Sequence, residues 1–286
     1  MEPAETPTIW SAPEPREAPD IYEPPSPARE DRGIFKRVGG GIVALGALIV
    51  KFAAQAKALL WLVPNVKLLA TFGTMAVSIL AYATIWGWKF GLGFVLLILI
   101  HELGHSFQLK REGIKSGFPI FIPFLGAYIG MKEMPKNAAA EARVGLAGPV
   151  LGTIGTLVPL ALYAATGNDL FRALAFIGFF INLFNLVPVL PLDGGRAMAA
   201  FSPWVWIFGL AVFIALAVFF PSPIILIILL LGGFEAYRRF KARHTQEMKE
   251  YHSVSTAQRL AIGAVYIGLA IALAVGIHYT HLPRSL

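Results

Sequence analysis

Two histidines four residues apart, His101 and His105, are the residues of this sequence best suited to chemistry. Four residues of an α-helix turn through about 400° and rise about 6 Å, so both imidazoles would lie on one face. Two imidazoles placed in this way can bind one Zn²⁺. Glu102 follows the first histidine, where its carboxylate could take a proton from a water activated by the metal. The pattern H-E-x-x-H therefore predicts a hydrolytic zinc site.

The residues before this motif make the prediction more specific. Residues 90–100 carry no charge, so the motif stands at the end of a stretch that could span a membrane. Ionisable groups inside a membrane are costly and usually serve a function. We therefore expect the metal site to lie within a membrane-spanning helix.

The composition supports a membrane protein. Of the 286 residues, 56% are hydrophobic and 14% are charged, whereas soluble domains average about 25% charged residues. The sequence has no cysteine, which excludes disulfides and thiolate metal sites. The sequence has a net charge of +7, which is typical of a membrane protein whose cytoplasmic loops face anionic lipid. We expect membrane lipid and no nucleic acid as a partner, because no basic stripe interleaved with aromatic residues occurs in a soluble segment.

The first 67 residues differ from the rest. Residues 1–33 are rich in proline and contain eight acidic residues and three arginines, which predicts a disordered cytoplasmic tail. Residues 34–67 are apolar but interrupted by Lys51 and Lys57. We interpret them as amphipathic helices on the membrane surface. A true span over residues 38–65 is the alternative.

The remaining sequence predicts an all-α polytopic membrane protein with six to seven spans. A catalytic transmembrane core would occupy residues 68–200, and additional transmembrane helices with a basic cytoplasmic loop would occupy residues 201–286. Lys110 and Arg111 end the second span, which places that end, with the two histidines, toward the cytoplasm. The expected spans are residues 68–87, 89–109, 138–165, 171–192, 204–220, 222–237 and 257–277, with residues 204–237 forming a hairpin.

Three stretches should depart from regular helix. Residues 114–134 combine glycines and prolines with aromatic and β-branched residues, which favours a small membrane-embedded β region between the second and third spans. Gly148-Pro149 should interrupt the third span, with Gly148 allowing close helix packing. In the segment of residues 185–196, two prolines should end the fourth span and Gly194-Gly195 should permit a sharp turn.

A catalytic zinc site needs a third protein ligand. Three acidic residues are candidates: Asp193, Glu141 and Glu235. Asp193 is the best placed, because its span returns to the membrane face of the two histidines and its helix is broken where a side chain would have to turn inward. Glu141 is the second choice.

These motifs together resemble the site-2 protease family of intramembrane zinc metalloproteases. The resemblance rests on H-E-x-x-H inside a span and on the later segment N-x-x-P-x-x-P-L-D-G of residues 185–194. It implies that His101, His105 and Asp193 bind Zn²⁺, that Glu102 is the general base and that Asn185 assists near the reacting carbonyl. Residues 118–130 and 147–149 also resemble the family's membrane-embedded strand region and its Gly-Pro segment.

We therefore expect an intramembrane zinc metalloprotease of the cell membrane. It would hydrolyse peptide bonds in or near transmembrane segments of membrane proteins, with its active site toward the cytoplasm. Two alternatives remain at this point. A transporter could use broken helices around a metal site, and a non-catalytic membrane scaffold could retain a structural metal.

Overall fold

The computed structural model describes residues 66–202, 204–220, 222–242 and 244–281. They belong to the second of two units into which the chain divides, Leu59–Leu286, and the first unit is Met1–Ala58. The predicted tail of residues 1–33 lies outside the described residues. So does the predicted surface-helix segment of residues 34–67, apart from its last two residues.

The described part is mostly helical with one small sheet, as the sequence predicts. One helix of the first half bears both histidines, and a short helix in the second half bears Asp193. The elements are α2 (Val66–Trp86), α3 (Trp88–Arg111), β1 (Ile120–Ile122), β2 (Gly126–Tyr128), α4 (Ala138–Thr166), α5 (Asp169–Asn185), α6 (Asp193–Ala197), the 3₁₀ turn η1 (Met198–Ala200), α7 (Trp204–Phe219), α8 (Pro223–Ala242), α9 (Gln246–Tyr251) and α10 (Thr256–Thr280).

Four helices of the described part are long and apolar enough to cross a membrane: α2, α3, α4 and α10. The predicted hairpin is present as α7 and α8, but α7 has only 16 residues and α8 carries Glu235 and a basic end. The predicted total of six to seven spans therefore remains a prediction.

The helix that precedes Asp193 is shorter than predicted. α5 ends at Asn185 rather than at residue 192, because Pro188 and Pro191 cannot supply the backbone donors of a regular helix. The predicted interruption of the third span at Gly148-Pro149 is also wrong, since α4 runs unbroken through Pro149. α4 packs closely against α3 and α5, and this packing stabilises a continuous helix although Pro149 supplies no backbone donor.

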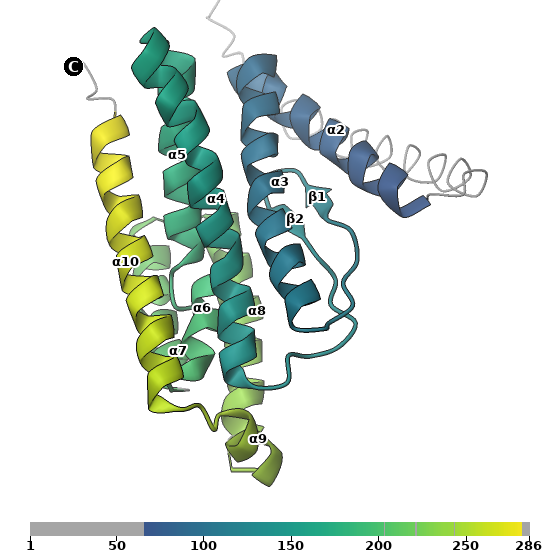
Figure 1. Ribbon diagram of the computed structural model, residues 1–286, viewed down its shortest axis with the longest axis vertical. Coiled ribbons are helices and arrows are strands. Elements are labelled where there is room, and N and C mark those ends of the chain that lie inside the picture. The colour runs from purple at the N-terminus through teal and green to yellow at the C-terminus, as the bar shows by residue number, and fades with distance from the viewer. Residues whose placement is uncertain (1–65, 203, 221, 243, 282–286) are drawn as a thin grey trace, which may run out of the picture. The chain divides into compact units, whose positions relative to one another are not determined.

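Three helices form the centre of the described unit. α3 packs against α4, and α4 packs against α5, while α2 covers α3 and α10 covers α5 (Figure 1). Small residues permit this close approach. A Cβ at Gly104 would lie 2.2 Å from the carbonyl oxygen of Ala147, and one at Gly178 would lie 2.6 Å from Oγ1 of Thr156.

The predicted β region is an antiparallel hairpin between α3 and α4. Ile120 pairs with Tyr128, and Ile122 pairs with Gly126. Side chains of α2 hold the outer side of β1: Thr71 Oγ1 donates a hydrogen bond to the Pro119 carbonyl (2.7 Å), and the Phe121 N–H donates to Thr74 Oγ1 (3.2 Å). α2 thus fixes one side of the hairpin.

The paired glycines after Asp193 serve a different purpose from the predicted sharp turn. Gly194 and Gly195 lie within α6, and neither is among the glycines with positive φ. A Cβ on Gly194 would lie 2.0 Å from the carbonyl oxygen of Leu186, and one on Gly195 would lie 2.5 Å from the backbone nitrogen of Leu190. Their lack of a side chain lets the 186–192 loop fold tightly over α6, which sets the position of Asp193.

Candidate metal centre

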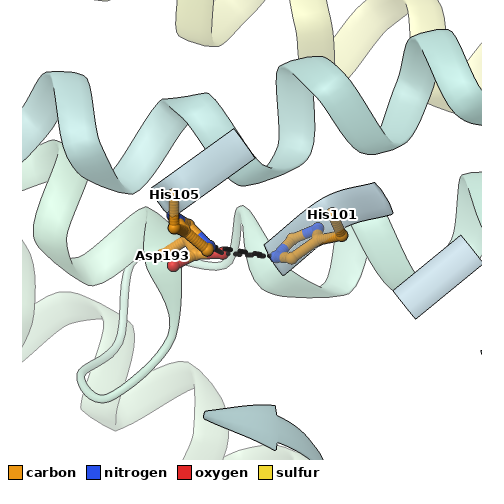
Figure 2. A group of neighbouring side chains, drawn as sticks. All are labelled: His101, His105 and Asp193. Carbon is orange, nitrogen blue, oxygen red and sulfur yellow. Dashed lines mark hydrogen bonds and ion pairs between the residues drawn. The ribbon is translucent and has the colours of Figure 1, made fainter. Parts of the chain in front are cut away.

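Three side chains from two distant segments meet at the middle of the described unit. His101 and His105 lie one turn apart on α3, and Asp193 begins α6. Oδ2 of Asp193 lies 3.0 Å from Nε2 of His101 and 3.1 Å from Nε2 of His105, and the two Nε2 atoms are 3.2 Å apart. Figure 2 shows the three side chains pointing toward one another. All three are buried.

The outer nitrogen of each imidazole has a fixed partner. Nδ1 of His105 lies 2.8 Å from the Val144 carbonyl oxygen, which can only accept a hydrogen bond. Nδ1 of His101 lies 2.8 Å from Oδ1 of Asn182. Asn182 is itself oriented, because its Nδ2 donates to the Gly178 carbonyl at 2.7 Å. Both Nδ1 atoms therefore carry hydrogen, and in the neutral rings both Nε2 lone pairs face Asp193.

This arrangement fits a zinc ion. Two imidazole nitrogens and one carboxylate oxygen are among the ligands that Zn²⁺ prefers, and they leave a fourth position for water or substrate. Ligand atoms about 2.0–2.1 Å from a tetrahedral ion lie about 3.3 Å apart, close to the separations of 3.0–3.2 Å found here. With neutral imidazoles, three electron-pair donors face one another without a hydrogen between them, and a cation removes that conflict.

α4 forms the wall behind the imidazoles and has room only for glycine there. A Cβ on Gly148 would lie 2.2 Å from Nε2 of His105 and 2.8 Å from Nε2 of His101. A Cβ on Gly145 would lie 2.8 Å from the backbone oxygen of Asp193. The Gly-Pro segment thus packs against the metal centre itself and not only against a neighbouring helix.

The two predicted catalytic residues, Glu102 and Asn185, differ in burial and in their position relative to the three central side chains. Glu102 is buried on α3 beside His101, and no hydrogen bond joins its carboxylate to another described residue. This carboxylate is therefore not committed to a structural partner within the described chain. Asn185 is the last residue of α5 and is half-buried. Its predicted role near the reacting carbonyl stays a prediction, because no contact with the three central side chains is described for it.

Sequence reasoning missed Asn182. It lies three residues before Asn185 on the same helix. Its side chain is buried, and its Oδ1 accepts a hydrogen bond from Nδ1 of His101. The available signal was an amide in the otherwise apolar stretch of residues 173–184, where a polar side chain needs a partner. The motif directed attention to Asn185 instead.

The other two candidates for the third ligand lie elsewhere. Glu141 pairs with Arg239 through two contacts of 2.7 and 2.9 Å, and Glu235 contacts the same guanidinium at 2.8 Å. Among the described residues, Asp193 is the acidic residue that joins the two histidines in a group able to hold a metal ion.

Comparison with known proteins agrees with this geometry. Residues 89–168 match the family model of peptidase family M50. Zinc metalloprotease MJ0392 of Methanocaldococcus jannaschii is 34% identical over 131 residues, which cover 44% of this chain and 38% of that protein. Putative zinc metalloprotease sll0528 of Synechocystis is 33% identical over 124 residues, covering 39% and 31% of the two chains.

A third relative is more distant. Putative zinc metalloprotease Rip3 of Mycobacterium tuberculosis is 28% identical over 132 residues, which cover 42% of this chain and 33% of that protein. The chain spans about a third of the length of the curated relatives that it matches. The resemblance indicated by the motifs is confirmed: residues 89–168, which include both histidines of the candidate metal centre, match the model of peptidase family M50, the site-2 protease family.

Proposed function

We propose that this chain is a zinc metalloprotease that hydrolyses peptide bonds in or near transmembrane segments of membrane proteins. The observation that carries the proposal is the meeting of His101, His105 and Asp193, with their acceptor atoms facing one another. The relatives named as zinc metalloproteases support the same chemistry.

The residues of the site would divide the work. His101, His105 and Asp193 would hold Zn²⁺, while Asn182 and the Val144 carbonyl keep the two rings in place. Zinc bound there would polarise a peptide carbonyl and acidify water. Glu102 would take a proton from the attacking water and pass it to the leaving amine. Asn185 would donate a hydrogen bond to the oxygen on which negative charge develops.

The surroundings favour a site within the membrane. The histidines lie on α3, one of the helices long and apolar enough to cross a membrane, and this helix ends in Lys110 and Arg111. By the positive-inside rule, that end faces the cytoplasm. We infer a multi-pass protein whose active site opens toward the cytoplasmic side and whose partners are membrane lipid and a transmembrane substrate.

The β hairpin would receive the substrate. A helical substrate hides its carbonyls in internal hydrogen bonds, so the segment to be cut must unwind before it reacts. α2 already covers the outer side of β1, which leaves the β2 side to accept an added strand. Exposed apolar side chains on the hairpin, among them Ile120, Leu125 and Tyr128, would contact such a segment.

Two measurements test this function. Zinc content of the purified protein should fall when His105→Ala removes a ligand, and the exposed His278→Ala should leave it unchanged. Glu102→Gln should retain zinc but lose cleavage of a membrane-embedded substrate in proteoliposomes, because the ligands are untouched. The exposed Glu247→Gln serves as its control. Full cleavage by Glu102→Gln would refute the general-base role, and metal-dependent flux without proteolysis would favour a transporter.

A further inference from the structure

The α7–α8 hairpin holds the segment that bears Asp193. Trp206 of α7 is 2% exposed, and its indole Nε1–H donates a hydrogen bond of 2.7 Å to the carbonyl oxygen of Gly195. Gly195 lies two residues after Asp193 within α6. The carbonyls at the end of so short a helix lack helical donors, so the indole satisfies one of them and fixes α6 relative to α7.

Both helices of the hairpin also pack closely against the 186–192 loop, which precedes Asp193. A Cβ at Gly209 of α7 would lie 2.1 Å from the carbonyl oxygen of Pro188. A Cβ at Gly232 of α8 would lie 2.0 Å from the carbonyl oxygen of Leu190. The Asp193 segment is therefore held from before and after the aspartate by the same hairpin.

Trp206 is in turn held by an ion pair. The guanidinium of Arg239 on α8 lies 5.1 Å from the centre of the Trp206 ring, a cation–π distance. The same group binds both carboxylate oxygens of Glu141 at 2.7 and 2.9 Å. Glu141 is 1% exposed and belongs to α4, the helix whose Gly145 and Gly148 contact the metal centre. Arg239 thus connects the hairpin to the opposite wall of the site.

We propose that Trp206 is a positioning residue for the third metal ligand, and that the Arg239–Glu141 pair keeps Trp206 in place. The inference rests on the proposed zinc function. Its consequence is that part of the metal affinity of the site is set by α7 and α8, which lie outside the segment matched by the family model.

The test compares two tryptophans on one helix. Trp206→Phe keeps an aromatic ring and removes the donor to Gly195, and Trp204→Phe makes the same change at a residue that is 65% exposed. The Zn²⁺ dissociation constant of the full-length protein in detergent, measured by chelator competition, should rise about tenfold or more for Trp206→Phe, as for other groups that orient ligands. Trp204→Phe should match the wild type.

A second readout separates positioning from general stability. Co²⁺ bound in place of Zn²⁺ reports ligand geometry through its visible absorption. The Co²⁺ spectrum should change for Trp206→Phe and not for Trp204→Phe, including at temperatures where both proteins are fully folded. An unchanged spectrum with unchanged Zn²⁺ affinity would overturn the proposal. A wild-type protein that binds no Zn²⁺ would instead overturn the proposed function, and this inference with it.

The ion pair is tested by a matched pair of arginines. Arg239→Lys loses the two-pronged contact with Glu141, whereas Arg238→Lys alters a side chain that is 64% exposed. Zn²⁺ affinity should fall only for Arg239→Lys. The double variant Glu141→Gln/Arg239→Gln removes both charges and should recover stability relative to either single variant, while its Zn²⁺ affinity stays low. Recovery of affinity together with stability would show that the pair does not position Trp206.

Discussion

The candidate metal centre and the ion cluster of Arg239, Glu141 and Glu235 are both largely buried groups of ionisable side chains from distant segments, yet their chemistry differs. Around Arg239, guanidinium donors alternate with the carboxylates of Glu141 and Glu235, and Tyr251 donates to Glu141. Every group has a partner of opposite character. Around Asp193, with neutral imidazoles, the facing atoms are all electron-pair donors. The first cluster is complete by itself, whereas the second has a ligand set that a bound cation such as Zn²⁺ would complete.

The largest effect on zinc binding is expected from filling the space beside the imidazoles. Gly148→Ala should abolish detectable zinc binding, because its Cβ would lie 2.2 Å from Nε2 of His105 and cannot be accommodated without moving α4. Gly233→Ala is the control, since no atom lies within 4 Å of a Cβ there. Zinc content of the two purified variants decides the matter, and normal zinc binding by Gly148→Ala would show that the imidazoles bind no metal on this side.

Neutralising one member of the ion cluster should affect stability. Glu141→Gln leaves the buried Arg239 charge with less compensation, which is expected to cost about 3–5 kcal/mol of unfolding free energy. Unfolding in detergent would measure this loss, and a chelator should not reproduce it in the wild type, because the cluster needs no metal. A loss below about 1 kcal/mol would mean that Glu235 alone satisfies Arg239.

The support of His101 comes next in size. Asn182→Ala removes the acceptor on Nδ1 of His101 and should weaken zinc binding about 10–100-fold. Asn182→Asp keeps an acceptor of similar shape and should retain most of the affinity. Equal zinc dissociation constants for both variants would show that the hydrogen bond to the ring has no part in metal binding.

The smallest effect concerns a pair outside both clusters. Arg143, hydrogen-bonded to Glu112 at the end of α3, holds the pKa of that carboxyl below its usual value. A lowered pKa stabilises the fold above the unfolded pKa of about 4.3, and that contribution is lost as the pH falls through the folded pKa. Arg143→Gln should remove at most about 1 kcal/mol at pH 7 and nothing below the folded pKa. The free energy of unfolding of the variant and the wild type, measured at pH 7 and below the folded pKa of Glu112, checks this. An equal loss of unfolding free energy at the lower pH would assign the effect to packing.

Local patterns predicted the parts of this site that depend on local structure. The spacing of His101 and His105 places both on one face of α3. The prolines after Asn185 end a different helix, α5, before Asp193. The glycines, prolines and β-branched residues of 114–134 indicated a small β region, which is the hairpin of β1 and β2. Asp193 was chosen from three candidates because its span returns to the membrane face of the two histidines and because its helix is broken there, and its metal ligation remains a prediction.

Features that depend on packing between distant segments had no local signal. The residues near Glu141 in the sequence do not indicate that it pairs with Arg239, 98 residues away. The role of Gly148 against the imidazoles and that of Gly194 against Leu186 follow from backbone approach, which a glycine in a sequence does not distinguish from a turn. The continuity of α4 through Pro149 depends likewise on its neighbours.

The central claim is that His101, His105 and Asp193 bind one catalytic zinc ion. Zinc K-edge X-ray absorption of the purified wild-type protein tests it most directly. We expect a shell of nitrogen and oxygen at about 2.0–2.1 Å with the outer scattering of two imidazole rings. Absence of bound zinc, or a zinc shell without imidazole scattering, would contradict it.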